Sequence, residues 1–239
     1  MNIIGLFPLT GNGGIASWTR KFLDTFPDET YQFETIDISP ASAREGKPDN
    51  TYIRLTTGIK TFFRIRKGLK LLLTARKFDI LHTTTSGKLG TMRDLMVARL
   101  CKRYNVKSIM HCRYGCITED ITGCGPFAIL LRGTMRLYDQ IWVLDSRSFE
   151  SLQKIGALAD KVFLTPNSID VTEQPDSRPK QYRKIAFCGN LLPTKGLYEL
   201  IQAVIKSDAE LNIIGPGTSE VIAEIGRLAG NELNRKIKL

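Results

Sequence analysis

The chain has 239 residues, of which 42 % are hydrophobic and 24 % are charged. This composition is typical of a folded globular protein and excludes a disordered chain. No run of about 18 apolar residues occurs, so a membrane-spanning helix is not expected. The formal net charge is +10, which predicts an anionic partner. A phosphorylated ligand or acidic lipid headgroups fit that charge better than nucleic acid, for which no recognition motif is present.

The amino-terminal segment and the cysteines favour a cytoplasmic protein. The first seven residues are apolar but follow no basic segment, so a buried strand fits better than a signal peptide. The number of cysteines is odd and their spacing is irregular, which predicts reduced thiols rather than disulfides. A zinc site at Cys112, Cys116 and Cys124 is an alternative, but no C-x-x-C pair is present and we favour a chance grouping.

Strand-like and helix-like segments alternate along the first two thirds of the chain. Apolar runs and alternating patterns predict strands over 2–7, 31–38, 79–82, 106–111, 140–144 and 161–165. Apolar residues at helical spacing predict helices over 15–26, 92–104, 127–137 and 146–155, with a strongly basic helix between 49 and 79. This alternation predicts a parallel sheet with helices on both faces.

A polar, proline-rich segment over 166–182 interrupts the alternation and predicts a linker. After it, strands are predicted over 184–188 and 211–214, and helices over 196–205 and 219–228. We therefore expect an α/β protein with two Rossmann-like, doubly wound domains over 1–165 and 183–239. The second domain holds two β-α units, where a doubly wound domain has about five or six, so we expect it to be incomplete.

A glycine-rich loop, Gly11-Asn12-Gly13-Gly14, joins the first strand to the first helix. Glycines let the backbone approach a ligand, and the amides at a helix start favour a diphosphate. We therefore expect Gly13 and Gly14 to bind nucleotide phosphates. A dinucleotide is an alternative, with Asp37 as the ribose-binding acid of an NAD(P)-dependent oxidoreductase. A loop that only permits a turn is the structural alternative.

A second glycine-containing loop, from Gly189 to Gly196, follows the first strand of the second domain. It lacks the spacing of a P-loop. Lys195 nevertheless precedes a predicted helix, and a lysine with a helix start suits a departing diphosphate. We expect Gly189, Asn190 and Lys195 to bind the same ligand, whereas a solvated lysine is the structural alternative.

His82 and His111 are the only histidines, and each is predicted to end a strand. The carboxyl ends of strands in doubly wound sheets are where ligands bind. This favours a shared cleft over two unrelated structural histidines. Arg113 and Tyr114 follow His111 and are expected to line the same cleft.

Eight basic residues and no acidic residue lie between Asp49 and Asp79, interleaved with apolar residues at helical spacing. Two interpretations stay open. The helix rests on an anionic membrane surface, or it belongs to the domain and has a solvated basic face. On the first interpretation the membrane surface includes Lys60, Phe62, Phe63, Arg64, Arg66, Lys67 and Lys70.

In their order along the chain, these motifs resemble those of group 1 (family 4) glycosyltransferases of the GT-B fold. The resemblance covers essentially the whole chain. It implies retaining transfer of a sugar from a nucleotide sugar to a glycan or lipid-linked acceptor, in cell-surface polysaccharide synthesis. The protein would then be cytoplasmic or peripheral on the inner membrane face. The segments that carry the resemblance are 13–15, 79–82, His111, 166–170, 187–196 and 211–217.

The resemblance also implies residue roles. Gly13 and Gly14 would face the donor diphosphate and sugar, and Lys195 would bind the diphosphate. His111 would lie near the reacting sugar as a catalytic residue that orients it. The family usually has an arginine where this chain has Asn190, so one phosphate charge would lack its partner. Because no D-x-D sequence occurs, we expect no metal and no other cofactor.

The family's acidic E-x₇-E segment would lie beyond Leu239. We therefore expect the 239 residues alone to have little activity. Two alternatives to an active transferase stay open. One is an inactive remnant that binds a nucleotide or a membrane, and the other is the oxidoreductase suggested by the first glycine loop.

Overall fold

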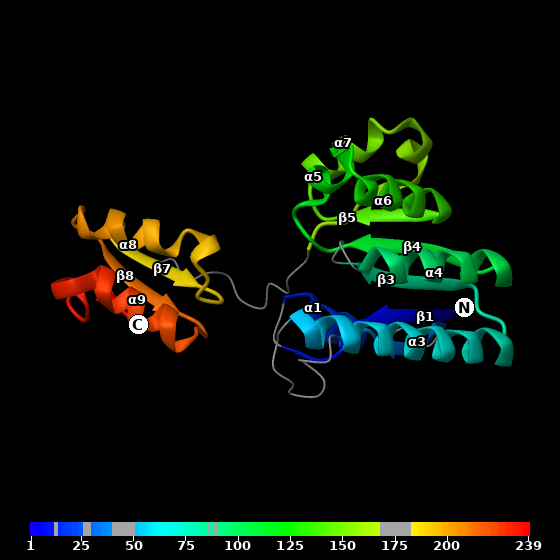
Figure 1. The fold of residues 1–239 in the computed structure, drawn as a ribbon, viewed down its shortest axis with the longest axis horizontal. Helices are drawn as coiled ribbons and strands as arrows, with labels where there is room; N and C mark the ends of the chain where they lie inside the picture. The colour runs from blue at the N-terminus through cyan, green and yellow to red at the C-terminus, as the bar shows by residue number, and fades with distance from the viewer. Residues whose placement is uncertain (12–13, 26–29, 40–50, 86, 88–89, 168–182) are drawn as a thin grey trace. The chain divides into compact units, whose positions relative to one another are not determined.

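The computed structural model describes residues 1–11, 14–25, 30–39, 51–85, 87, 90–167 and 183–239. The chain divides into a first unit, Met1–Ile169, and a second unit, Asp170–Leu239 (Figure 1). Most of the predicted linker, 166–182, lies outside the described residues. Within those residues, no helix has both the length and the apolar character needed to cross a membrane.

The first unit is built on a sheet of six parallel strands in the order β2-β1-β3-β4-β5-β6 (Figure 1). The predicted parallel α/β architecture is therefore confirmed. Because β2 and β3 lie on opposite sides of β1, the sheet has a switch point there, where such sheets bind ligands. The strands are β1 (Asn2–Phe7), β2 (Gln32–Asp37), β3 (Ile80–Thr85), β4 (Lys107–Cys112), β5 (Gln140–Val143) and β6 (Val162–Leu164).

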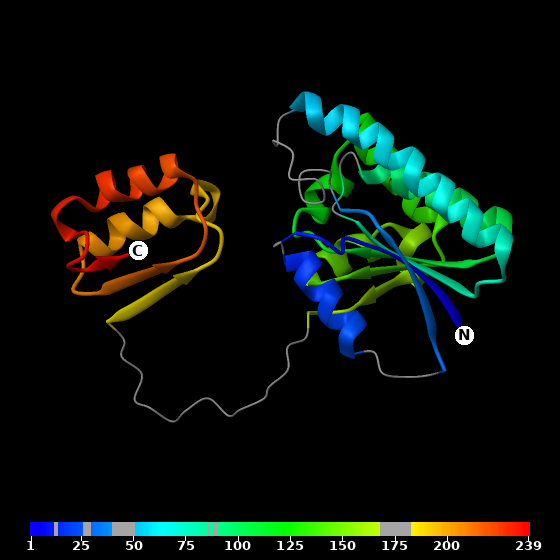
Figure 2. The ribbon, with the colours of Figure 1, turned by 90° about the horizontal axis from the view of Figure 1, so that it is seen from below.

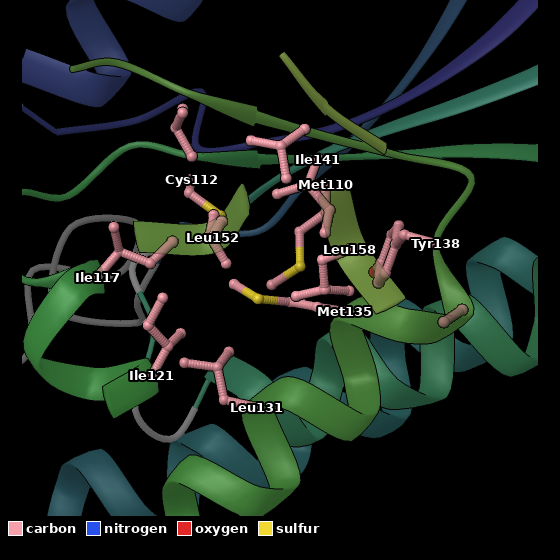
Figure 3. Packing of buried hydrophobic residues seen from close by; sticks show 13 residues of the cluster. Met110, Cys112, Ile117, Ile121, Leu131, Met135, Tyr138, Ile141, Leu152 and Leu158 are labelled. Atoms are coloured by element: carbon pink, nitrogen blue, oxygen red, sulfur yellow. The ribbon is translucent and has the colours of Figure 1, made fainter. Parts of the chain in front are cut away.

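Helices cover both faces of this sheet, and Figure 2 shows α1 and α3 on opposite sides of it. The helices of the unit are α1 (Gly14–Thr25), α3 (Thr51–Ala75), α4 (Gly90–Tyr104), α5 (Ile117–Thr122), α6 (Pro126–Leu137) and α7 (Ser146–Gln153). On the face away from α1, Met110 and Ile141 of the sheet pack with Leu131 and Met135 of α6 (Figure 3). This cluster anchors β4 and β5, whose carboxyl ends border the candidate site.

The predicted basic helix is α3, and one of its faces belongs to the core. Ile65, Leu69 and Leu73 are buried and recur every four residues, which places them on one side of the helix. They pack with residues of β1 and α4. The opposite side leaves Phe63 and Leu71 each 60 % exposed. The helix is thus part of the domain, and a membrane contact of its exposed face stays a prediction.

The second unit has a sheet of three parallel strands in the order β7-β8-β9, with both helices on one face (Figure 2). Its elements are β7 (Lys184–Cys188), α8 (Leu197–Ile205), β8 (Glu210–Ile214), α9 (Ser219–Ala229) and β9 (Ile237–Lys238). The prediction of only two strands is wrong. The strand β9 has two residues, fewer than the about four that an alternating pattern needs to reveal a strand.

The position of His82 also differs from the prediction. The strand β3 continues through Thr85, so His82 lies inside the strand rather than at its end. The polar threonines that follow His82 resemble a loop in sequence, but threonine is β-branched and fits a strand well. His111 is the last residue but one of β4, close to the predicted strand end.

Candidate functional site

The loop between β1 and α1 is held in place by residues on both sides of it. Asp37 accepts hydrogen bonds through Oδ1 from the amides of Leu9, at 3.0 Å, and Ser39, at 2.8 Å. Arg20 of α1 donates to the carbonyl of Gly11 at 3.0 Å. The Asp37 carboxylate therefore has a structural role, which explains an acid at this position without a ribose ligand.

Gly14 begins α1 at the carboxyl edge of the sheet. A Cβ atom added to Gly14 would meet no atom within 4 Å, so the space beside this helix start is open. Gly13 lies outside the described residues, and its phosphate contact stays a prediction.

His82 and His111 lie side by side on the face of the sheet that α1 covers. Their rings are stacked, with centroids 5.4 Å apart and planes inclined by 15°. Nε2 of His82 is 3.3 Å from Nδ1 of His111. Phe7, Trp18 and Trp142 pack edge-on around the pair. The structure thus brings the two predicted histidines together in a buried aromatic cluster.

Both histidines are neutral at pH 7. Burial, and secondly the charge of Arg113, lower the pKa of His82 to about 3. Burial, then His82 and Arg113, lower the pKa of His111 to about 3. A neutral imidazole carries one N–H, so the neighbours of each ring determine which nitrogen holds the proton.

The tautomers follow from Arg113, because a guanidinium group only donates hydrogen bonds. Nη1 of Arg113 lies 3.5 Å from Nε2 of His111, so this nitrogen accepts. The His111 proton is then on Nδ1, from which it is donated to Nε2 of His82. Both nitrogens of His111 are bonded within the protein, which argues against a general base. A catalytic role for His111 stays a prediction.

Arg113 is 7 % exposed and has only neutral partners in the described part of the chain. Its Cζ lies 3.7 Å from the ring centroid of Trp18, and its Nη2 donates to Oδ1 of Asn167 at 2.6 Å. The buried Nε has no hydrogen-bond partner among the residues that the structure describes. Burial lowers the pKa of Arg113 to about 10, so the side chain is charged at pH 7.

A cavity of about 450 Å³, here called the Arg113 cavity, lies between α1 and Arg113. Its described lining includes two basic residues and no acidic residue. Of the predicted cleft residues, Arg113 lines this cavity, whereas His82, His111 and Tyr114 are not among its lining residues. Tyr114 instead packs against the cluster of Figure 3. The lining residues are Gly14, Ile15, Ser17, Trp18, Lys21, Arg113, Leu144 and Asn167.

In the second unit, the loops after β7 and β8 are bonded backbone to backbone. The amide of Gly189 donates to the carbonyl of Ile214 at 2.9 Å, and that of Leu191 to the carbonyl of Pro216 at 2.8 Å. The φ angles of Gly189 and Gly215 are 146° and 149°, a region that favours glycine. A Cβ atom on Gly215 would lie 1.9 Å from the oxygen of Gly189, so only glycine fits there.

Lys195 was expected at a helix start, but it lies in the short 3₁₀ turn η2 (Pro193–Lys195), and α8 begins at Leu197. Its Nζ is 3.9 Å from the position of a Cβ atom on Gly189. The amino group therefore lies next to Gly189, the glycine that follows β7. The neighbouring Asn190 is exposed, so the three predicted donor-binding residues lie at one end of β7.

The zinc alternative is not supported by the cysteines. Cys112 is buried, whereas Cys116 and Cys124 are exposed. Among the residues that the structure describes, no three metal-binding side chains gather as a site would require.

No protein-family model and no curated protein matches the chain. Solved structures do match it. The complex of Anabaena HepE with UDP is 14 % identical with a TM-score of 0.61, over 100 % of this chain and 68 % of that chain. The UDP-GlcNAc 2-epimerase of Neisseria meningitidis bound to UDP-GlcNAc is 14 % identical with a TM-score of 0.59, over 100 % and 72 %. Arabidopsis thaliana UGT89C1 with UDP-L-rhamnose is 10 % identical with a TM-score of 0.55, over 91 % and 65 %.

The fold is of the GT-B type. The GT-B likeness confirms the predicted class, an α/β protein with two Rossmann-like units. The identities are too low to show more than this fold. Membership of the group 1 (family 4) glycosyltransferases therefore stays a prediction, as do the roles of the site residues.

Proposed function

We propose that the chain is a glycosyltransferase that moves a sugar from a nucleotide-sugar donor to a glycan or lipid-linked acceptor. The observation that carries this proposal is the position of the Lys195 amino group beside Gly189, at the carboxyl end of β7. A cation next to a glycine without a side chain offers both charge and space to a phosphate. The UDP and UDP-sugar ligands of GT-B structures similar to this chain support the same ligand class.

The chemistry of transfer fits these residues. Glycosyl transfer proceeds through an oxocarbenium-like state while negative charge builds on the departing diphosphate. The Lys195 amino group would stabilise that charge, an effect of about a hundredfold or more in rate. His111 would act through Arg113, which it contacts, because its own ring nitrogens are bonded to Arg113 and His82. From the sequence resemblance we further propose retention at the anomeric carbon and a role in cell-surface polysaccharide synthesis.

A nucleotide-sugar epimerase is the second candidate, because several of the similar structures are UDP-GlcNAc 2-epimerases. Inversion at a carbon needs a positioned acid and base. The described residues that line the Arg113 cavity include no carboxylate, and burial lowers the pKa values of His82 and His111 beside it to about 3, which makes both of them weak bases. This environment favours transfer over epimerisation.

Ligand titration tests the proposed donor class. UDP and GDP should each be compared with NAD at fixed salt, using wild type, Lys195→Ala and the control Lys206→Ala. Lys206 is an exposed lysine of the same unit, at the end of α8. We expect a diphosphate to bind more tightly than NAD, and Lys195→Ala alone to weaken it about tenfold or more. Tighter binding of NAD would refute the nucleotide-sugar ligand.

Product analysis separates the two enzyme candidates. Nucleotide sugars should be incubated with and without lipid or glycan acceptors and followed by NMR. Release of the nucleoside diphosphate that depends on the acceptor supports a transferase. Conversion of the donor into an isomeric nucleotide sugar without an acceptor identifies an epimerase.

We also propose that the exposed face of α3 contacts an anionic membrane. Phe63 and Leu71 on this face are exposed large apolar side chains, and Lys60 and Lys67 lie beside them in helical projection. An apolar strip flanked by basic residues fits an acidic lipid surface. Phe62 is half-buried and packs against Phe63 at 5.6 Å, so it supports the face rather than forming its surface.

Cosedimentation with vesicles tests this contact. Phe63→Ser with Leu71→Ser should reduce pelleting with anionic vesicles, whereas Ile129→Ser should not. Ile129 of α6 is as exposed as Phe63 and provides the matched control. Equal pelleting of the wild type with neutral and anionic lipid would contradict the proposal.

A further inference from the structure

The Arg113 cavity contains a buried cation, and no described residue supplies an anion to balance it. A buried charge normally has an ionic partner, because removal from water is costly. The contacts of Arg113 in the described part of the chain are an aromatic ring, an amide oxygen and a neutral imidazole. Among the described residues, its Nε has no hydrogen-bond partner. Within that part of the chain, no anion compensates the positive charge of this side chain.

Other features of the cavity add positive potential. It is bounded by the first turn of α1, where helix amides and the helix dipole favour an anion. Lys21 lines the same cavity from the second turn. The volume of about 450 Å³ falls within the range of small-ligand pockets.

The guanidinium group is also held in one position. Trp18 contacts Arg113, and its own ring is stacked with that of Phe22 at 5.0 Å. Asn167 binds the far end of the guanidinium. A cation fixed in this way loses little freedom when a ligand binds, which is how a preformed site gains affinity.

We propose that the Arg113 cavity binds an anionic group, a phosphate or a carboxylate, carried by the acceptor. This proposal rests on the proposed function, because only a transferase has an acceptor. The described residues that line the cavity belong to the first unit. The cation proposed for the donor, Lys195, belongs to the second unit. We therefore assign the anion of this cavity to the acceptor and that near Lys195 to the donor.

Binding of small sugars to the full chain tests the proposal. Glucose 6-phosphate and glucuronate should be titrated into the millimolar range, with glucose as their neutral counterpart. The indole N–H signal of Trp18 reports on the cavity, and that of Trp142, the second of the two tryptophans, serves as reference. We expect both anionic sugars to bind about tenfold or more tightly than glucose.

Three variants test whether Arg113 and Lys21 cause the tighter binding of the anionic sugars. Arg113→Gln should bring both anionic sugars close to the affinity of glucose. Lys154→Gln, the same charge change at the exposed end of α7, should alter neither. Because Arg113→Gln removes a buried side chain, Lys21→Gln provides a second variant on the exposed side of α1 and should weaken both anionic sugars severalfold. Anionic sugars that bind no better than glucose, or bind equally to every folded variant, would overturn the proposal.

A UDP titration distinguishes the acceptor from the donor as source of the anion. Saturating UDP should leave the anionic sugars bound at the Trp18 signal. Displacement of the sugars by UDP, together with weaker UDP binding in Arg113→Gln, would place the donor diphosphate in the cavity and overturn the acceptor assignment. A complete lack of UDP binding would instead count against the proposed function. The sugar titrations would still show whether the Arg113 cavity binds an anionic group.

Discussion

Mild acid should destabilise the first unit while its carboxylates are still ionised. In the folded unit the pKa of His82 and that of His111 are each lowered to about 3, whereas an unfolded histidine titrates near about 6.5. The unfolded state therefore binds more protons between these values. Stability is complete above about pH 6.5 and falls as the pH decreases towards 3.

The size of the effect follows from the two pKa values. At pH 5 an unfolded histidine is almost fully protonated and the buried one is not, which costs about 2 kcal/mol for each ring. The pair together costs about 4 kcal/mol, a large part of a typical stability of about 5–15 kcal/mol. Most carboxylates are still charged at pH 5 and contribute little to this loss.

Urea denaturation at pH 7.5 and pH 5 measures this loss. Trp18 and Trp142, the two tryptophans of the chain, both contact the histidine pair, so their fluorescence reports on the first unit. His82→Gln and His111→Gln should each be less stable than wild type at pH 7.5 but should lose less on acidification. Equal free energies of unfolding for the wild type at both pH values would refute the reasoning, as would variants that retain the full pH dependence.

Three further substitutions test the packing. Gly215→Ala should destabilise the second unit by about 2 kcal/mol or more in thermal denaturation, because the φ of Gly215 is 149° and an added Cβ would overlap a backbone oxygen. The control Gly226→Ala should not destabilise the unit, because there is space for a Cβ at this position of α9. Leu69→Ala should cost about 2–5 kcal/mol of unfolding free energy, and the exposed Phe63→Ala less than about 0.5 kcal/mol. Asp37→Ala should cost about 1–3 kcal/mol in urea denaturation because two backbone amides lose their acceptor; no loss would show that this carboxylate is available to a ligand.

Much of the fold is predictable because most of its helices and strands show a local pattern of apolar residues. The strand β7 has the predicted bounds, Lys184–Cys188, since it is a short apolar run closed by glycine. The helix α5 is missed because its six residues include only two buried apolar side chains, Ile117 and Ile121, which are too few to reveal a period. The strand β9 is missed for the same reason, because it is only two residues long.

The candidate site is predictable only in part. Glycine loops and histidines at predicted strand ends indicate where a ligand site lies, because these residue types and positions are informative locally. The contacts of Arg113 cannot be predicted locally, because Trp18 and Asn167 are distant from it in the sequence. The sequence places Arg113 near the cleft but contains no sign that its neighbours are neutral.

The tautomers of the histidine pair have a consequence for how the first unit accommodates its buried charge. The lone pair of His111 Nε2 faces Arg113, and the N–H of His111 Nδ1 is donated to His82, so the negative end of the His111 dipole faces the guanidinium. A neutral dipole in this orientation stabilises a cation without cancelling its charge. A carboxylate in place of His111 would have stabilised the cation and abolished its field. The imidazole pair leaves that field available in the cavity.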